Sequence, residues 1–300
     1  MKKIFTLALV VIAAMSMNAQ TTTVVRVLKD GQVVSQEPVG DNLQITFAEV
    51  DDNCVPGDFS VSSTKKVRFS KGNLQYQAST QTWRFAENQW DQVGNATQGT
   101  VYVGEEKCDN GLISDTYTGW IDLFGWGTGN NPTQTSSNNA DYATFTDWGV
   151  NPISNGGNEP NQWRTLTEEE WNYLLTRRPG ANVRRGLATV NGVEGVILLP
   201  DEWGVPNGFD FNYSISTFAE NKLTKKQWAA FEKLGAVFIP CGYRYGTTTL
   251  IMSTGVNVWT STPDDRYSDD AYDAGISKNF ARTTQNERHY GCSVRLVKDL

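Results

Sequence analysis

Short runs of alternating hydrophobic and polar residues begin after the first twenty positions of the chain. Val24–Leu28 and Val33–Val34 are two such runs, and an Asp-Gly pair at positions 30 and 31 separates them. Both residues of this pair tolerate the positive φ of a tight turn, so the pattern predicts a β-hairpin. With a third strand expected at Leu43–Phe47, residues 20–50 are predicted to form a small β element with little core of its own.

Period-two alternation resumes after residues 51–58 (DDNCVPGD), which have the composition of a linker. Strands are expected at Phe59–Ser62, Lys66–Ser70, Asn73–Gln77 and Trp83–Phe85. From residue 94 to residue 161 the periodicity disappears among Gly, Asn, Thr and aromatic residues. A stretch of this length is either an ordered functional loop region or a less regular half of the fold.

Two capping boxes predict helices in the second half of the chain. Thr167–Glu170 (TEEE) precedes Trp171, and Thr224–Gln227 (TKKQ) precedes Trp228, with Gly235 placed to end the second helix. Both tryptophans are expected in the core. An Asn-Gly turn at 191 and 192 leads toward an expected strand. The later strands are expected at Gly195–Leu199, Ala236–Ile239, Val256–Thr260, Ser277–Ala281 and Ser293–Val297.

These elements predict an α+β fold over residues 59–300, with two main helices, short antiparallel strands and long irregular loops. The first nineteen residues are expected to be a cleavable secretory leader. Lys2 and Lys3 form its positive region, Ile4–Ala14 is an apolar run too short to span a bilayer, and Ala19 is a small residue at the cleavage point. The chain is therefore expected to be secreted, periplasmic or at the cell surface, without a membrane span.

Acidic residues outnumber basic ones, with 33 Asp and Glu against 26 Lys and Arg, for a net charge of −7. This sign argues against nucleic acid and anionic membranes as partners. Ten Trp, 11 Tyr and 27 Gly, with only four Met, indicate a loop-rich fold. Aromatic residues exposed in such loops are available for binding.

Four cysteines, at positions 54, 108, 241 and 292, allow three disulfide pairings. No CxxC motif is present and His289 is the single histidine, so a zinc site is not expected. Disulfides are the default in an exported chain, with inert buried thiols as the alternative. A Ser/His/Asp triad would have to use His289, for which a surface position is expected, and GxSxG, HExxH and P-loop motifs are absent.

Two motifs, WRTLTEEEWNYL (Trp163–Leu174) and YGCSVRLV (Tyr290–Val297), resemble a helix and the closing strand of the formylglycine-generating, sulfatase-modifying enzyme superfamily. FSKGNLQYQ, DLFGWGTG, VFIPCGYRYG and VWTSTP resemble the major paralogous domain group, a large set of secreted proteins of Bacteroidetes and Fibrobacter. The resemblance covers Phe59–Lys298. It implies an irregular C-type-lectin-like α+β architecture.

Enzymes of that superfamily hold copper with two nearby cysteines and oxidise a substrate cysteine. Here Cys241 begins CGYRYG without a second cysteine in the segment, and the next one is Cys292 in the closing strand. Without a thiolate pair a copper site lacks its soft ligands, so no catalytic residue is assigned. A structural disulfide between Cys241 and Cys292 is favoured over a metal pair.

Two segments contain candidate calcium ligands. Glu159-Pro160-Asn161 matches the EPN tripeptide of sugar-binding C-type lectins, which would require a cis peptide at Pro160; a polar loop ahead of the helix cap is the alternative. Residues 263–273 (PDDRYSDDAYD) lack EF-hand spacing, and a solvated acidic loop is favoured there. The candidate Ca2+ ligands of this loop are Asp264, Asp265, Asp269, Asp270 and Asp273.

Aromatic residues in the irregular region are candidates for ligand contact or for an irregular core, with the core favoured. They are Trp120, Phe124, Trp126, Tyr142, Phe145 and Trp148. Tyr243 and Arg244 are further candidate ligand contacts. No cofactor is expected apart from the candidate Ca2+.

The expected function is non-catalytic recognition of an extracellular glycan or protein through loops near residues 120–163 and 243–273. A copper-dependent oxidase of the formylglycine-generating type and a structural component of a surface assembly are the alternatives.

Overall fold

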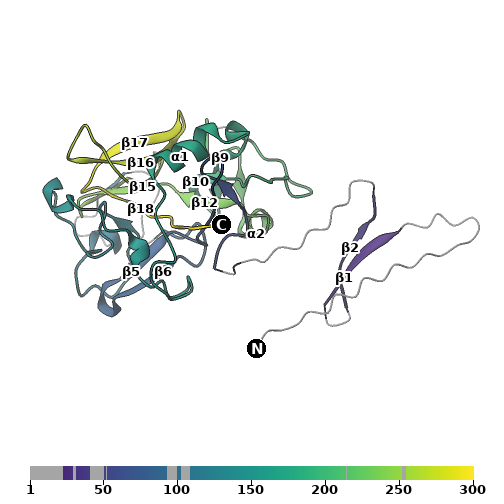
Figure 1. The fold of residues 1–300 in the computed structure, drawn as a ribbon, viewed down its shortest axis with the longest axis horizontal. Helices are drawn as coiled ribbons and strands as arrows, with labels where there is room; N and C mark the ends of the chain where they lie inside the picture. Colours follow the sequence, from purple (N-terminus) through teal and green to yellow (C-terminus); the bar gives the residue numbers. More distant parts are fainter. Residues whose placement is uncertain are drawn as a thin grey trace, which may run out of the picture. The chain divides into compact units, whose positions relative to one another are not determined.

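The computed structural model describes residues 23–29, 32–40, 51, 53–92, 100–102, 109–213, 215–251 and 255–300. The chain divides into two compact units, residues 1–49 and residues 50–300, and each is considered by itself. Figure 1 shows the ribbon of both.

The first unit contains an antiparallel hairpin of β1 (Val24–Lys29) and β2 (Gln32–Pro38). The register shifts between Val27 and Leu28, and the Arg26 Nε donates to the Gln36 Oε1 across the hairpin at 2.6 Å. The predicted hairpin is therefore confirmed. Its turn at positions 30 and 31 and the third strand expected at Leu43–Phe47 lie outside the described residues.

The second unit contains a sheet with eight described strands. They are β7 (Thr100–Tyr102), β8 (Leu123–Phe124), β13 (Tyr243–Tyr245), β14 (Thr249–Ile251), β15 (Gly255–Pro263), β16 (Asp270–Ser277), β17 (Ala281–Glu287) and β18 (Gly291–Ser293). The order is β17, β16, β15, β18, β13, β14, β7, and β8 pairs with β18 off this path. Neighbouring strands are antiparallel except β15 and β18.

A four-stranded sheet and two small sheets complete the described β structure. The four-stranded sheet has the order β11 (Lys222–Leu223), β9 (Arg185–Val190), β10 (Val193–Leu198), β12 (Val237–Pro240). The predicted Asn-Gly turn joins β9 to β10, with Asn191 at φ 49° and Gly192 at φ 88°. The small sheets are β19 (Val297–Asp299) with β4 (Lys66–Phe69) and β3 (Phe59–Ser60), and β5 (Leu74–Gln77) with β6 (Thr82–Phe85).

Both predicted helices are present, and both begin with the predicted capping box. Thr167 caps α1 (Glu168–Asn172), which continues as the π-helical turn η5 (Tyr173–Arg177), and Thr224 caps α2 (Lys225–Lys233). Gly235 follows α2 with φ 90°, the left-handed conformation that a terminating glycine supplies. The short 3₁₀ helices are η1 (Ala78–Thr80), η2 (Asp109–Gly111), η3 (Asn139–Tyr142), η4 (Trp148–Val150) and η6 (Ala181–Val183). The described chain is thus mixed α+β, mostly strands with two short α-helices, as predicted.

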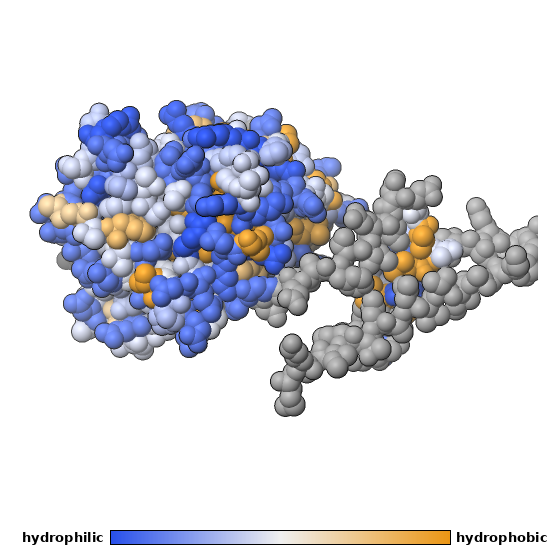
Figure 2. Space-filling model, in the orientation of Figure 1, coloured by the Kyte–Doolittle hydropathy of each residue, from blue (hydrophilic) through white to orange (hydrophobic). Residues whose placement is uncertain are grey.

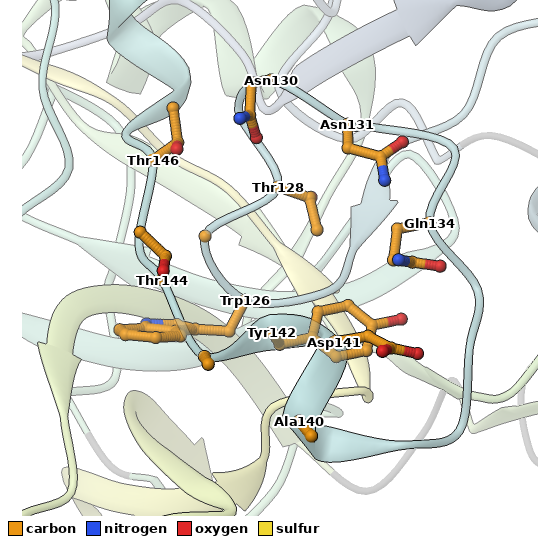
Figure 3. A pocket seen from close by; sticks show the side chains of 12 residues that line it. Trp126, Thr128, Asn130, Asn131, Gln134, Ala140, Asp141, Tyr142, Thr144 and Thr146 are labelled. Carbon is orange, nitrogen blue, oxygen red and sulfur yellow. The ribbon is translucent and has the colours of Figure 1, made fainter.

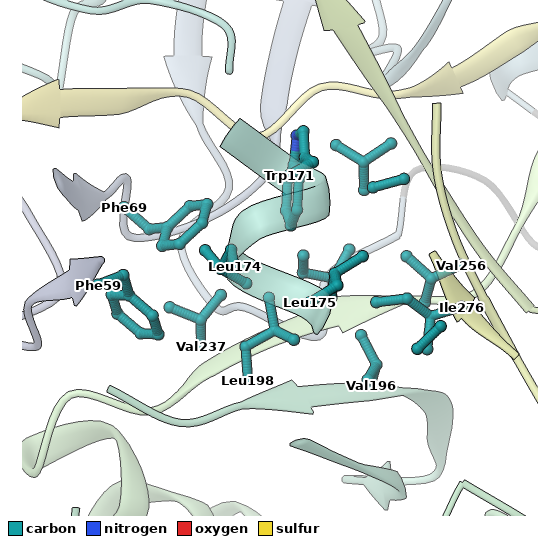
Figure 4. Close-up of a cluster of buried hydrophobic side chains, with 14 of the residues drawn as sticks. Phe59, Phe69, Trp171, Leu174, Leu175, Val196, Leu198, Val237, Val256 and Ile276 are labelled. Carbon is teal, nitrogen blue, oxygen red and sulfur yellow. The ribbon is translucent and has the colours of Figure 1, made fainter. Parts of the chain in front are cut away.

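The first core cluster lies beneath α1, between the small β3–β4 sheet and the two larger sheets. Trp171, Leu174 and Leu175 point from α1 and η5 into this cluster, between Phe69 on one side and Ile276 on the other (Figure 4). A second cluster is rich in aromatic residues and a third surrounds Trp228 of α2. The burial of Trp171 and Trp228 confirms the positions predicted from the capping boxes.

Three segments differ from the sequence expectations. The strand expected at Ser277–Ala281 is wrong, because β16 ends at Ser277 and the Ser277 N–H donates to the Phe280 carbonyl, which closes a hairpin turn. Exposed Lys278 and Asn279 form the tip of this turn. The strand expected at Ser293–Val297 is divided between the end of β18 and the start of β19. Residues 53–58, which have the composition of a linker, pack on the domain, with Val55 and Gly57 buried.

The face of the second unit seen in Figure 2 is mostly hydrophilic, with small and separate apolar patches. Among the described residues, no helix has the length and apolar character needed to cross a membrane.

The capping box of α1 is testable by removing its side-chain acceptor. Thr167→Ala deletes the Oγ1 that accepts from the Glu170 N–H at 3.2 Å, so we expect the free energy of unfolding to fall by about 1 kcal/mol. Thr176→Ala, four residues after Asn172 whose carbonyl accepts from its hydroxyl, is the control and is expected to change stability by less than about 0.5 kcal/mol. Urea unfolding of both variants measures the difference, and equal effects would contradict the predicted role of the cap.

Candidate functional site

A polar pocket of about 290 Å³ lies within the irregular loop that follows β8. Figure 3 shows Asn131, Gln134 and Asp141 on one side of it and Thr144 and Thr146 on the other. The lining residues are Trp126, Gly127, Thr128, Asn130, Asn131, Gln134, Ala140, Asp141, Tyr142, Ala143, Thr144 and Thr146. All of them belong to the segment 126–146, so one loop forms the whole pocket.

Backbone hydrogen bonds close this loop on itself without a regular sheet. The Thr146 N–H donates to the Gly127 carbonyl at 3.0 Å, and the Gly129 N–H donates to the Thr146 carbonyl at 3.1 Å. Gly127 has φ 69°, and a Cβ there would approach the Phe145 Cα to 2.7 Å. Glycine is therefore required at this crossing, both by conformation and by space.

Two buried aromatic rings form the floor of the pocket. Trp126 and Tyr142 are each 2% exposed, and both make hydrogen bonds to backbone carbonyls. The Trp126 Nε1 donates to Thr260 at 2.9 Å, and the Tyr142 hydroxyl donates to Ser136 at 2.8 Å. Burial raises the pKa of Tyr142 to about 12, so its hydroxyl stays protonated at neutral pH. The floor is aromatic and buried, while the rim carries exposed polar groups.

The rim presents amide and hydroxyl groups and one carboxylate. Asn130, Asn131 and Thr144 are exposed, and Asp141 is the single acid among the twelve lining residues. None of the twelve is basic. The pocket therefore presents hydrogen-bond donors and acceptors with a slightly negative character, which suits a neutral polyhydroxy ligand better than an anion.

Arg244 holds the pocket loop against the large sheet from behind. Its buried guanidinium donates to the carbonyls of Leu123 at 3.0 Å, Gly246 at 3.0 Å and Gln134 at 3.5 Å. Desolvation lowers its pKa, and the three carbonyl acceptors offset part of the cost of burial. Arg244 was predicted to contact ligand; in the structure its guanidinium is enclosed by protein and positions Gln134.

Tyr243, Tyr245 and Tyr290 form a cluster that we call the tyrosine platform. Successive side chains of a strand point to opposite faces, so Tyr243 and Tyr245 of β13 share one face while Arg244 points to the other. The Tyr243 and Tyr290 rings are parallel, with centroids 5.9 Å apart, and the Tyr245 ring meets Tyr290 edge-on at 5.1 Å. Tyr245 is 49% exposed. The prediction that Tyr243 lies at the site stays a prediction, and Tyr245 and Tyr290 are additions to it.

His289 connects the tyrosine platform to the pocket. Its Nδ1 lies 2.9 Å from the Asn139 Oδ1, its backbone N–H donates to the same oxygen at 3.1 Å, and its ring packs edge-on against Tyr290. The expected surface position is wrong, because the side chain is buried between Asn139 and the tyrosines. Desolvation lowers its pKa, so the ring is neutral at physiological pH.

The Glu159-Pro160-Asn161 segment forms an exposed loop ahead of α1. None of the described peptide bonds is cis, so the cis Pro160 that a lectin-type calcium site requires is not present. Asn161 has φ 60°, and its N–H donates to the Gly149 carbonyl at 2.9 Å. The segment thus has the geometry of the polar loop that was the alternative interpretation.

The five aspartates of the acidic loop differ in burial and in hydrogen-bond partners and do not form one cluster of ligands. Asp264 is buried and accepts from Arg266, and Asp273 is buried between the side chains of Asn257 and Thr284. Asp265 and Asp269 are exposed, and Asp270 is half-buried. Within the described ranges, no three His, Cys, Asp or Glu side chains are grouped so that they could hold a metal ion.

The aromatic residues of the irregular region are mainly core residues. Phe124, Trp126 and Trp148 belong to the second core cluster, and Phe145 packs against it. Trp120 is half-buried beneath the Arg84 guanidinium, which lies 3.8 Å from its ring centre. Buried aromatic side chains therefore form the core of this region, which has little regular secondary structure.

The three described cysteines, Cys54, Cys241 and Cys292, are free thiols buried in the core. Cys241 packs in the first cluster and Cys292 in the second, and neither forms the expected disulfide. Burial raises the pKa of both thiols, and it raises that of Cys54 to about 12. Cys108 lies outside the described residues. These buried thiols have the environment of inert structural groups rather than of nucleophiles.

The polar rim of the pocket is the part that sequence reasoning missed. Asn130, Asn131, Gln134 and Asp141 belong to a run of small and polar residues that has no periodicity. The one available signal is that this run, GTGNNPTQTSSNNADYATFT, lies between Trp126 and Trp148 and contains Tyr142 and Phe145. Such a signal does not say which side chains face one another.

The described domain is a mixed α+β unit with a small polar pocket in an aromatic-floored loop. Comparison of the chain with protein-family models, with curated proteins and with solved structures finds no match in any of the three.

Gly291 is testable as the residue that makes room for Arg244. It lies opposite Arg244 in the β13–β18 pair, and a Cβ at Gly291 would lie 2.2 Å from the Arg244 Cγ. Gly291→Ala is expected to lower the free energy of unfolding by about 1–3 kcal/mol, because the packed core must shift. Gly204→Ala, where no atom lies within 4 Å of the added Cβ, is the matched control. Chemical denaturation measures both, and an unaffected Gly291→Ala variant would show that Arg244 is not tightly held.

Asp273 makes a pH-dependent contribution to stability. Burial raises its pKa from 3.8 to about 6, so the folded state binds the proton more tightly than the unfolded state. This contribution is complete below about pH 4 and is lost as the pH rises through about 6. Asp273→Asn, which is neutral at every pH, is expected to stabilise the fold at pH 7.5 by roughly 1–3 kcal/mol and much less at pH 4.5.

Urea unfolding at the two pH values measures this difference, with Asp265→Asn at an exposed position as the control. A stability change of Asp273→Asn that is the same at both pH values would contradict the assignment.

Proposed function

We propose that this chain is a secreted or cell-surface recognition domain that binds neutral carbohydrate without transforming it. The observation that carries the proposal is the polar pocket, in which amides, hydroxyls and one carboxylate surround two buried aromatic rings. Sugar hydroxyls both donate and accept hydrogen bonds, and Asn, Gln, Thr and Asp side chains complement them. The absence of a basic residue from the lining favours a neutral sugar over an acidic one.

The size and rigidity of the pocket also support a small polar ligand. Its volume of about 290 Å³ is at the lower end of the range for small-molecule sites. Trp126 and Tyr142 hold the floor in place, and Arg244 fixes the backbone of Gln134. A preformed site loses little conformational entropy on binding.

Binding without catalysis is favoured by what surrounds the ligand position. Glycoside hydrolysis ordinarily uses two carboxyl groups on either side of the scissile bond, and Asp141 is the single carboxylate of the lining. Oxidation by paired thiolates would need Cys241 and Cys292 together at the surface, whereas each is a protonated thiol in a different core cluster. The oxidase alternative therefore has less support than recognition.

The same proposal includes a C-type-lectin-like architecture and membership of the secreted group that the motifs resemble. Two short helices, short strands and a long ordered loop that carries the pocket support it. The proposed export agrees with a binding role for soluble or surface-attached sugars. In this proposal the sugar contacts are made directly by the side chains that line the pocket.

A glycan array tests the proposal. The array contains neutral glucans, mannans, galactans and chito-oligosaccharides beside sialylated, sulfated and uronic-acid glycans, and is run in Ca2+ and in EDTA. We expect retention of neutral glycans in both buffers. Asn131→Ala and Asp141→Ala, at exposed lining positions, are each expected to weaken binding about tenfold, since each removes a hydrogen-bonding group.

Asn279→Ala is the matched control, because Asn279 is exposed at the β16–β17 turn and does not line the pocket. Thermal unfolding of each variant shows that the fold is retained. The proposal fails if the wild-type chain retains no neutral glycan, or if both pocket variants bind as the wild type does.

A further inference from the structure

The tyrosine platform lies beside the pocket, and η3 is the wall that the two have in common. Ala140, Asp141 and Tyr142 of η3 line the pocket, while Asn139, the first residue of η3, contacts His289. The Asn139 Nδ2 also donates to the Glu287 Oε2 at 3.3 Å. Asn139 thus fixes the pocket wall to the turn that carries Tyr290.

His289 fixes the other half of this connection. Its ring lies 5.8 Å from the Tyr245 ring and 5.0 Å from the Tyr290 ring, and meets both edge-on. Its Nδ1 lies 2.9 Å from the Asn139 Oδ1 and 3.3 Å from the Glu287 Oε2, and both oxygens accept, so the tautomer with the proton on Nδ1 fits this position. Asn139 and His289 therefore connect η3, which lines the pocket, to the Tyr245 ring.

Tyr245 is the exposed member of the tyrosine platform. Among the described residues, Tyr245 and Tyr267 are the strongly exposed aromatic side chains, at 49% and 62%. Tyr267 belongs to the acidic loop and lies near the Arg266 guanidinium. Tyr245 instead lies at the end of β13, supported edge-on by two rings. An aromatic ring held in this way offers a large, rigid surface at low entropic cost.

We infer that the tyrosine platform is a second sugar subsite, so that the ligand of the pocket is an oligosaccharide that continues across η3 onto Tyr245. This inference rests on the proposed function, because it takes one sugar unit to lie in the pocket. The apolar C–H face of a further unit stacks on the Tyr245 ring, and the hydroxyls at its edge face solvent. Affinity then increases with the number of sugar units.

The experiment compares ligand lengths by calorimetry with the full chain. The probes are homo-oligosaccharides of one to six units of glucose, mannose, galactose and N-acetylglucosamine. For the wild type we expect affinity to rise from one unit to the longer members of at least one series. Tyr245→Ala is expected to weaken binding of the longer members about three- to tenfold and to leave the single sugar unchanged.

Tyr245→Phe keeps the ring and is expected to retain the length dependence, and Tyr267→Ala is the control for loss of an exposed tyrosine. Thermal unfolding confirms that each variant is folded. Equal affinity for one and six units in the wild type, or an equal effect of Tyr245→Ala at all lengths, overturns the second subsite while sugar binding in the pocket stands. If no probe binds the wild-type chain, the subsite and the neutral-sugar proposal both fail.

Discussion

The buried guanidinium of Arg244 is the interaction on which the arrangement of the pocket depends. It donates to backbone carbonyls from three separate segments, those of Leu123, Gln134 and Gly246. A buried charge that loses such acceptors costs several kcal/mol, so the segments of Leu123 and Gln134 are held close to β13. Gly291 makes this possible, because no larger residue leaves space for the Arg244 side chain.

The irregular region is ordered by aromatic packing and side-chain hydrogen bonds instead of a continuous sheet. The indole N–H groups of Trp126 and Trp259 donate to the carbonyls of Thr260 and Phe124, which satisfies polar groups inside an apolar cluster. The polar side chains of the loop, such as Asn130, Asn131 and Asp141, remain exposed to solvent. The pocket is formed in this way with little regular secondary structure.

The residues with the most reactive chemistry lie in the interior and serve the fold. His289 connects η3 to the tyrosines, Asp273 joins β15 and β17 through Asn257 and Thr284, and the thiols of Cys241 and Cys292 fill apolar space. The pocket rim, in contrast, carries amides and hydroxyls. This distribution of side chains supports the proposed recognition role.

Local patterns were enough to predict the elements whose signals lie within a few residues. The Asn-Gly turn before β10, both capping boxes and the burial of Trp171 and Trp228 follow from short-range geometry and appear as predicted. The mixed α+β class follows from the same elements. Boundaries were less predictable, as in the β16–β17 turn, because a run of mixed residues can either continue a strand or reverse it.

The sequence by itself determined the short strands, the capped helices and the acidic character of this protein. Only the tertiary structure decided that Asn131, Gln134 and Asp141 share a pocket, that His289 is buried, and that Cys241 and Cys292 lie in different clusters. The physical reason is that hairpin turns and helix caps depend on neighbouring residues, whereas these positions depend on contacts such as that between Arg244 and Gln134, 110 residues apart. Such contacts leave no periodic trace in the chain.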